Sequence, residues 1–450
     1  MTAHPANAAP ASYGQIFNII VSTVSHDWAA AGDTAFAERN VPYVGAKLDL
    51  INSRSFHGDD AMFLRFARYY LRLLGDPNFA LIKVGGDTRH DWLIGFETRA
   101  TEDALYVTES WGDDRLHAGD RIVAVDGEPL ANYRSDLRRY ALYGDTPERE
   151  DWSHFLRYAD SIEVEHAAGG TRTTLHPLHL STQAPRPVTP PCAFELLDGP
   201  HGSVARLSLG EIDDPSCLED LLAAHHDEIV AAERLVLDLR RCAGTPLDTA
   251  VALMPYLIDA PMTPADFLGE QGLYLRYSHR NVQRMVASLE TMRDGGYEVD
   301  LGDGVEGSDT AALDEEIASL RALDGAGVVW EDAQMPEEWL VPVEPAAGPA
   351  RVVVLSDIGC RSEGEQLLAM ASTQRKVVTL GRASLGNSDH QEIIGVNFDD
   401  DIFFAYPLGR TKAAAEGHGV LGRGVPVQVH VPWTPDELER DVLLEQALEA

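Results

Sequence analysis

Ser362 stands at a position that suits a serine nucleophile. It follows RVVVLS (351–356), an apolar run that predicts a buried strand, and it begins a stretch to Ala371 that predicts a helix. A serine there lies among unpaired backbone N–H groups at the positive end of the helix dipole. Attack by its hydroxyl on a carbonyl creates an oxyanion that such N–H groups can bind. Ser362-x-x-Glu365 is also a capping box, so this segment alone leaves helix capping and nucleophilic catalysis both open.

The loop after a second predicted strand can supply hydrogen-bond donors. The segment LVLDLRRCAGTP (235–246) predicts a buried parallel strand that ends at charged residues and leads into small ones. Ligand sites of α/β folds lie at the carboxyl ends of such strands. The backbone N–H groups of residues 241–244, including that of Gly244, can therefore face an oxyanion. Asp238 and Arg240 are expected to form a structural ion pair.

A third candidate site can bind the end of a peptide. WLIGF (92–96) and RLHAGDRIVAVDGEPL (115–130) predict short strands, and Val-Asp-Gly-Glu at 125–128 predicts a hairpin turn. An extended peptide can pair with the edge of such a sheet while backbone N–H groups of a loop bind its terminal carboxylate. The expected loop consists of Leu93, Ile94, Gly95 and Phe96. The alternative is a small β-barrel without a ligand.

The elements around these segments predict an α/β protein of several domains. Residues 1–84 read as helical, with an apolar face in AMFLRFARYYLRLLGD. Residues 85–182 predict a module of short strands. Residues 183–262, which begin with a proline-rich linker, and residues 346–450 alternate strands and helices, so a parallel sheet with crossover helices is expected. The polar segment 263–345 is interpreted as an insertion or cap.

The composition of the chain disfavours several kinds of binding partner. The 450 residues carry a net charge of −36, which disfavours nucleic acid, and no apolar run is long enough to span a membrane. The N-terminus lacks the pattern of a secretion signal, which predicts a cytoplasmic protein. Neither GxxxxGK nor HExxH occurs, and the four cysteines lack CxxC spacing, so no cofactor, metal or disulfide is expected.

Five motifs, in order, resemble those of the tail-specific, C-terminal processing serine peptidases. Residues 116–130 are similar to the Gly-Asp-x-Ile and Val-Asp-Gly pattern of their PDZ domains, and residues 235–244 to their Asp-Leu-Arg-x-Asn-x-Gly-Gly segment. Residues 352–365 resemble the strand and loop that carry the nucleophile, and residues 381–388 resemble the Gly-x-x-Thr-x-Gly-Lys segment. Residues 416–420 and 440–450 resemble the end of the family's chains. The resemblance extends from about residue 70 to the C-terminus, with the insertion excluded.

The resemblance implies a fold, a nucleophile and a substrate class. It implies N-terminal helices, a PDZ-like module and a ClpP/crotonase-like α/β core, with Ser362 as the nucleophile. The N–H groups of Glu363 and of the 241–244 loop would form the oxyanion hole. The substrate would be a peptide or protein C-terminal segment, with its carboxylate bound by residues 93–96.

The sequence departs from the family at the general base. Bacterial processing proteases have a lysine about 25 residues after the serine, where this chain has Asn387. The tricorn-like branch has a histidine in a Gly-Asp-x-His segment, where this chain has Asn78 after Gly-Asp-Pro. A neutral amide takes no proton at neutral pH. The loop corresponding to Asn-x-Gly-Gly is also altered, to Cys-Ala-Gly-Thr at 242–245.

Three explanations for the missing base stay open on the sequence alone. His390 can swing towards the serine, or His418 can act as the base with support from Glu416, although a surface role is expected for each histidine. Alternatively, hydrolysis has been lost and peptide binding kept. The sequence thus supports two hypotheses: a serine peptidase that uses Ser362, and a catalytically impaired peptide-binding protein on the same scaffold.

Overall fold

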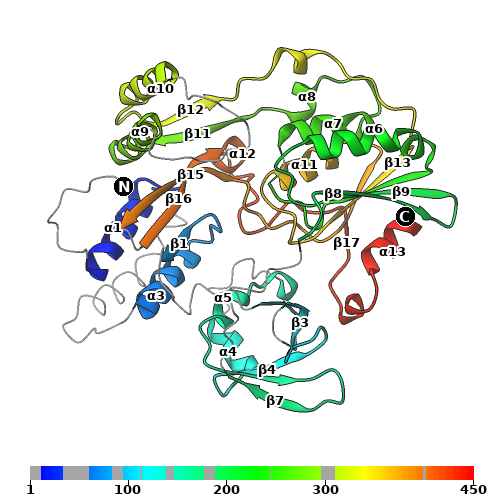
Figure 1. Cartoon of the computed structure of the whole chain (residues 1–450), viewed down its shortest axis with the longest axis horizontal. Helices are drawn as coiled ribbons and strands as arrows, with labels where there is room; N and C mark the ends of the chain where they lie inside the picture. Colours follow the sequence, from blue (N-terminus) through cyan, green and yellow to red (C-terminus); the bar gives the residue numbers. More distant parts are fainter. Residues whose placement is uncertain are drawn as a thin grey trace. The chain divides into compact units, whose positions relative to one another are not determined.

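The computed structural model describes residues 12–33, 60–83, 95–111, 114–137, 146–176, 188–244, 246–294, 310–398 and 402–450. These residues fall into two units. Unit 1 comprises residues 1–88, 272–333 and 389–419, and unit 2 comprises residues 89–271, 334–388 and 420–450. In the described part of the chain, unit 1 contains one sheet and unit 2 contains two (Figure 1). Each unit also has its own clusters of buried side chains.

Unit 1 is built on one antiparallel sheet with helices beside it. Its elements are α1 (Tyr13–His26), α3 (Asp60–Leu73), β1 (Ala80–Lys83), β11 (Gly272–Tyr277), α9 (His279–Arg293), α10 (Thr310–Ala322), β12 (Gly327–Asp332), β15 (His390–Phe398), β16 (Ile402–Thr411) and α12 (Lys412–Ala415). β16 pairs with β1, β11 and β15, and β11 also pairs with β12. The segment predicted as an insertion or cap therefore contributes two strands to this sheet.

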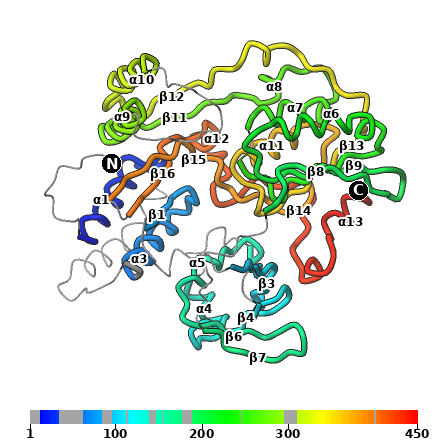
Figure 2. Tube along the Cα trace, viewed as in Figure 1, coloured from blue at the N-terminus to red at the C-terminus, as the bar shows by residue number. Residues whose placement is uncertain are grey.

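Helices α1 and α3 lie with β1 and β16 in unit 1, as Figure 2 also shows. Phe63 and Tyr70 of the apolar face predicted for α3 are buried, as is Leu74 just after the helix, whereas Met62 is exposed. α1 begins with a capping box in which Ser12 and Gln15 exchange hydrogen bonds between side chain and backbone. These helices therefore bury their apolar faces in a cluster that includes Phe404 of β16.

The larger sheet of unit 2 confirms the predicted parallel core. Its strands are β8 (Cys192–Asp198), β9 (Ser203–Leu209), β10 (Arg234–Asp238), β13 (Arg351–Ser356), β14 (Val377–Gly381) and β17 (Val429–His430), in the order β17-β14-β13-β10-β9-β8. All neighbours pair in parallel except β8 and β9. Every residue of β10 is buried, as expected for a strand covered on both faces.

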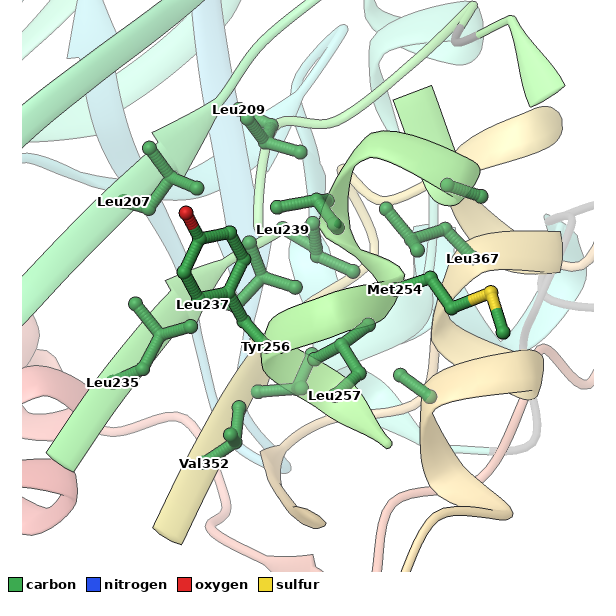
Figure 3. Close-up of a cluster of buried hydrophobic side chains, with 14 of the residues drawn as sticks. Leu207, Leu209, Leu235, Leu237, Leu239, Met254, Tyr256, Leu257, Val352 and Leu367 are labelled. Atoms are coloured by element: carbon green, nitrogen blue, oxygen red, sulfur yellow. The ribbon is translucent and has the colours of Figure 1, made fainter. Parts of the chain in front are cut away.

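Helices cover both faces of this parallel sheet. The helices that accompany it are α6 (Ser216–Ala231), α7 (Leu247–Leu257), α8 (Pro264–Leu268), α11 (Glu363–Ser372), α13 (Val442–Glu449) and two short 3₁₀ helices, Glu337–Leu340 and Pro435–Leu438. Side chains of α7 and α11 pack on one face with Leu207, Leu237 and Val352 (Figure 3). Leu218 and Leu222 of α6 belong to the same cluster. α13 packs on the other face through Leu443 and Ala447. The sheet thus holds β10 and β13, and the loops after them, in fixed register.

A smaller antiparallel sheet forms the first part of unit 2. Its strands are β2 (Phe96–Ala100), β3 (Leu105–Ser110), β4 (Arg121–Val125), β5 (Glu128–Pro129), β6 (Ile162–Glu165) and β7 (Arg172–Leu175), with α4 (Leu130–Leu137), α5 (Ser153–Leu156) and a 3₁₀ turn at Pro147–Arg149. The order is β2-β3-β4-β6-β7, and β5 pairs with β4. The hairpin predicted at 125–128 is confirmed, with positive φ at Asp126 (51°) and Gly127 (77°), as a type I′ turn requires.

Candidate active site

The conformation of Ser362 is unusual for a helix start. α11 begins at Glu363, and Ser362 precedes it with φ 53° and ψ −127°. Few residues other than glycine adopt positive φ, and such strain clusters at functional sites. The Ser362 side chain makes no capping hydrogen bond to the helix, so the capping box with Glu365, one of the two roles left open by the sequence, does not form. The hydroxyl is directed to another partner because the backbone turns sharply here.

That partner is the side chain of Asn387. The Ser362 N–H donates to Asn387 Oδ1 (2.7 Å), and Asn387 Nδ2 donates to Ser362 Oγ (3.1 Å). The backbone N–H can only donate, so it fixes which end of the amide is oxygen. Ser362 Oγ therefore accepts a hydrogen bond from Asn387, the residue that the sequence resemblance aligns with the lysine base. Among the described residues, no imidazole, amine or carboxylate lies within hydrogen-bonding distance of this oxygen.

The loop at 241–244 contacts the chain on both sides of Ser362. The Arg361 N–H donates to the Cys242 carbonyl (2.9 Å), and a Cβ added to Gly364 would lie 2.7 Å from that same oxygen. Gly244 adopts a φ of 58°, which glycine adopts without strain. Among the described residues, no acceptor is paired with the N–H groups of Glu363 and Gly244. The N–H group of Glu363 is therefore an available donor next to Ser362, and that of Gly244 is an available donor in the 241–244 loop.

Cysteines near this site do not compete with Ser362 as nucleophiles. Cys360 and Cys242 are both buried. Burial raises the pKa of the Cys360 thiol well above its ordinary value, so the thiolate is scarce at neutral pH. Ser362 is partly accessible in the same loop. The serine is therefore the better candidate for attack on a substrate.

The end of β10 is held by the predicted ion pair. Asp238 contacts Arg240 (2.7 Å) and Arg206 (2.8 Å), and Arg240 also contacts Asp441 at the start of α13 (2.7 Å). Burial raises the pKa of Asp238, but its bonds with Arg240 and Arg206 outweigh that effect and lower it. The pair thus fixes the strand end from which the 241–244 loop departs. This is a structural role, as expected.

Asp357, the first residue after β13, anchors the start of the loop that carries Ser362. It accepts hydrogen bonds from Arg99 of β2 (2.8 Å) and from Arg382 (2.9 Å). Burial alone would raise the pKa of Asp357, but the charges of Arg99 and Arg382 hold it well below its ordinary value. The smaller sheet of unit 2 is in this way tied to the strand that leads to Ser362.

The Asp357 pairs are expected to weaken in acid. Because the folded-state pKa is lowered, their stabilisation is complete above about pH 5 and declines as the pH falls towards the folded-state pKa. Asp357→Asn should cost about 3 kcal/mol at pH 7, since it leaves the partly buried Arg99 guanidinium without its carboxylate and removes one of the carboxylates that pair with Arg382. Urea unfolding measured from pH 7 to pH 2 tests this, because the difference between wild type and variant should shrink with acid. A difference that stays constant over this range would contradict the assignment.

The other predicted base residues lie in unit 1. Asn78 Nδ2 donates to the His390 carbonyl (2.7 Å). The His390 ring is buried, so the expected surface role is wrong. Its Nδ1 bonds to Asp76 Oδ2 (2.7 Å), which also accepts from Trp28 Nε1 (2.9 Å). Any swing of the His390 ring would have to break its bond to Asp76.

The remaining predicted residues are only partly described. Glu416 and His418, after α12, are both exposed, and the surface role expected for His418 agrees with this exposure. Leu93 and Ile94 lie outside the described residues. Gly95 has a φ of 65° and accepts from the Trp111 N–H through its carbonyl (2.8 Å), and Phe96 is buried.

Sequence reasoning missed several charged residues of this region. Arg99 and Arg149 belong to the smaller sheet region but bond to the parallel-sheet core of unit 2. No motif around either arginine indicates these contacts. Glu365 lies in the Ser-x-x-Glu motif, but the helix-capping interpretation concealed its true partners, which are backbone N–H groups of residues 386–388.

Comparison with solved structures identifies the fold. Mature CPAF complexed with lactacystin matches with a TM-score of 0.57 at 12% identity, covering 95% of each chain. Mature CPAF without that compound gives 0.57 at 13% identity, covering 97% of this chain and 95% of the other. The chain has the fold of the tail-specific, C-terminal processing proteases. The photosystem II D1 C-terminal processing protease also matches, with 14% identity, 98% coverage of both chains and a TM-score of 0.48.

Comparisons of the amino-acid sequence find no relative of this chain. No family model matches the chain, and no curated protein does. Within the described residues, no helix is long and apolar enough to cross a membrane. In the same residues, no group of three or more histidine, cysteine, aspartate or glutamate side chains is placed to hold a metal ion.

Proposed function

We propose that this chain is a serine-type peptidase that cleaves peptides or protein C-terminal segments, with Ser362 as its nucleophile. The observation that carries the proposal is the placement of Ser362 at positive φ before α11, with its side chain turned away from the helix. The N–H groups of Glu363 and Gly244 supply candidate oxyanion donors. The shared protease fold supports the same scaffold.

The proposed reaction follows from these groups. Ser362 Oγ attacks the carbonyl carbon of the scissile peptide bond and loses its proton. The carbonyl oxygen becomes an oxyanion that the N–H groups of Glu363 and Gly244 bind. Collapse of this intermediate breaks the C–N bond, and the amine leaves with a proton. Water then hydrolyses the acyl-serine ester and frees Ser362.

The smaller sheet is proposed to bind the substrate's C-terminus. β2 is an edge strand of this sheet, and an edge strand can pair with an extended peptide. Residues 93–96, the last of which is the first residue of β2, are proposed to supply N–H groups to the carboxylate. Arg99, in the same strand, bonds to Asp357 next to the Ser362 loop. A peptide on β2 would therefore lie on an element joined to the nucleophile's strand.

Hydrolysis by the wild-type chain is proposed to be slow. Asn387 donates to Ser362 Oγ and cannot accept its proton. A positioned general base contributes about 10²–10⁴-fold in rate. Without a general base, the proton of Ser362 passes to water, and the rate of attack lacks most of this enhancement.

A fluorophosphonate probe tests the proposed nucleophile. We expect the purified full-length chain to be labelled slowly at Ser362, because the probe needs a nucleophile and an oxyanion hole but little leaving-group assistance. Mass spectrometry of the labelled peptide locates the site. The Ser362→Ala variant should give no label, and it should also abolish release of the C-terminal product from a peptide with a free carboxylate. If the probe labels another residue, or labels nothing even after prolonged incubation, Ser362 is not the nucleophile. The alternative would then hold, in which the chain binds peptides without hydrolysing them.

A further inference from the structure

Six consecutive residues next to Ser362 are held by two buried charged side chains. Residues 383–385 present their carbonyl groups to Arg149, and residues 386–388 present their N–H groups to Glu365. Arg149 is 4% exposed and Glu365 is 0% exposed. The segment 383–388, here called the clamped loop, therefore has its backbone fixed along its whole length.

Arg149 fixes the first half of the clamped loop. Its Nη1 donates to the carbonyls of Ala383 (2.9 Å) and Ser384 (2.6 Å), and its Nη2 donates to that of Leu385 (3.1 Å). A guanidinium group is rigid and planar, so three carbonyls that meet it must keep fixed directions. Lysine carries one compact charge and cannot reproduce this fork.

Glu365 fixes the second half from within α11. Its carboxylate accepts from the N–H groups of Gly386, Asn387 (3.0 Å) and Ser388 (3.0 Å). Successive N–H groups that converge on one anion form a concave backbone nest. Gly386 also has a φ of 88°, and a Cβ there would lie 2.5 Å from the Val420 carbonyl. The nest can therefore close only with glycine at this position.

Asn387 transmits this constraint to Ser362. Its backbone N–H is bound by Glu365, and its side-chain amide bonds to both the N–H and the hydroxyl of Ser362. The first of these two bonds, to Asn387 Oδ1, supports the positive φ of Ser362. Glu365 lies in α11, three residues after Ser362, so a closed set of contacts joins the helix, the clamped loop and the nucleophile.

We infer that Arg149 and Glu365 are positioning residues for Ser362, acting through the clamped loop and the amide of Asn387. The inference rests on the proposed function of Ser362 as nucleophile. Glu365→Gln places an NH₂ group against a backbone N–H, and Arg149→Lys removes the guanidinium fork. Either change should let Asn387 move and lower the rate of fluorophosphonate labelling at Ser362 by about 10²-fold, as a displacement of 1 Å can do.

A double-mutant cycle separates positioning from a general structural role. Labelling rates are measured for wild type, Glu365→Gln, Asn387→Ala and the double variant. If Glu365 acts through Asn387, the double variant should label at about the rate of Asn387→Ala, because the link is already broken. If the labelling rate of the double variant instead falls by the product of the two single-variant effects, the inference is wrong. Arg149→Lys with Asn387→Ala repeats the cycle if Glu365→Gln does not fold.

Hydrogen exchange tests the clamped loop without any need for activity. In Glu365→Gln, the N–H groups of residues 386–388 should exchange faster, while those of β13 stay protected. Glu219→Gln, an exposed glutamate in the first turn of α6, and Arg172→Lys on β7 are matched controls that should change neither readout. Unchanged exchange in Glu365→Gln would overturn the positioning role. Faster exchange with no label in any protein would instead refute the nucleophile.

Discussion

Replacing Asn387 with lysine is expected to raise the rate of peptide hydrolysis by about 10²-fold, the lower end of what a general base contributes. The Asn387 side chain already reaches Ser362 Oγ, with Nδ2 at 3.1 Å. Its backbone is held by Glu365, a contact that depends on the N–H group and not on the side chain. A lysine at this position would therefore begin from a fixed Cα next to the hydroxyl.

The Asn387→Lys variant is not expected to gain the full rate enhancement of a general base. Lysine cannot accept the hydrogen bond that Asn387 Oδ1 takes from the Ser362 N–H, so support for the positive φ is lost. The amine must also be neutral to take a proton. The positive end of the α11 dipole disfavours the ammonium form, which helps. The rate should consequently rise with pH as the new amine loses its proton.

Asn387→Met is the matched control for this substitution. Methionine has nearly the length of lysine but carries no base, so it also removes the amide while adding nothing that accepts a proton. Initial rates with a peptide that has a free C-terminus, measured from pH 6 to pH 10, compare the two variants. Equal rates and equal pH profiles for lysine and methionine would show that position 387 does not serve Ser362 as a base. Adding Ser362→Ala to Asn387→Lys should remove the gain.

The parallel core was predictable because its signals are local and strong. Continuous apolar runs such as 351–356 favour buried strands, and their spacing requires crossover helices. The position of Ser362 at the start of α11 follows from the same pattern. Its neighbour Asn387 was expected by resemblance to a family motif, and the contact between their side chains agrees with that expectation.

The contacts of the charged side chains were not predictable from local pattern. The same Ser-x-x-Glu spacing serves a capping box when the serine has extended φ and ψ, and a tertiary contact when it does not. The backbone at Ser362 decides between these outcomes, and that backbone depends on residues far along the chain. Arg149 contacts Ser384, and Arg99 contacts Asp357, over separations of more than 200 residues, so only the folded chain reveals these partners.

Gly364→Ala is expected to destabilise the protein, although the same change inside a helix usually stabilises by about 1 kcal/mol. Gly364 lies in the first turn of α11, and a Cβ there would lie 2.7 Å from the Cys242 carbonyl oxygen and 3.1 Å from Cys242 Sγ. Backbone cannot give way as a flexible side chain can. Overpacking of this kind costs about 1–3 kcal/mol, which equals or exceeds the gain in helix propensity.

The overlap between the Cβ added at position 364 and the Cys242 carbonyl oxygen should also lower the reactivity of Ser362. Relieving it moves α11 away from the 241–244 loop, and so moves the Glu363 N–H relative to the Gly244 N–H, the two donors proposed for the oxyanion hole. Donors displaced in this way would bind the oxyanion poorly, so fluorophosphonate labelling should fall by about 10²-fold. Gln366→Ala, in the same helix, is the control and should leave labelling unchanged. A Gly364→Ala protein that melts higher than wild type and labels at the same rate would show that the helix and the loop do not meet closely at this point.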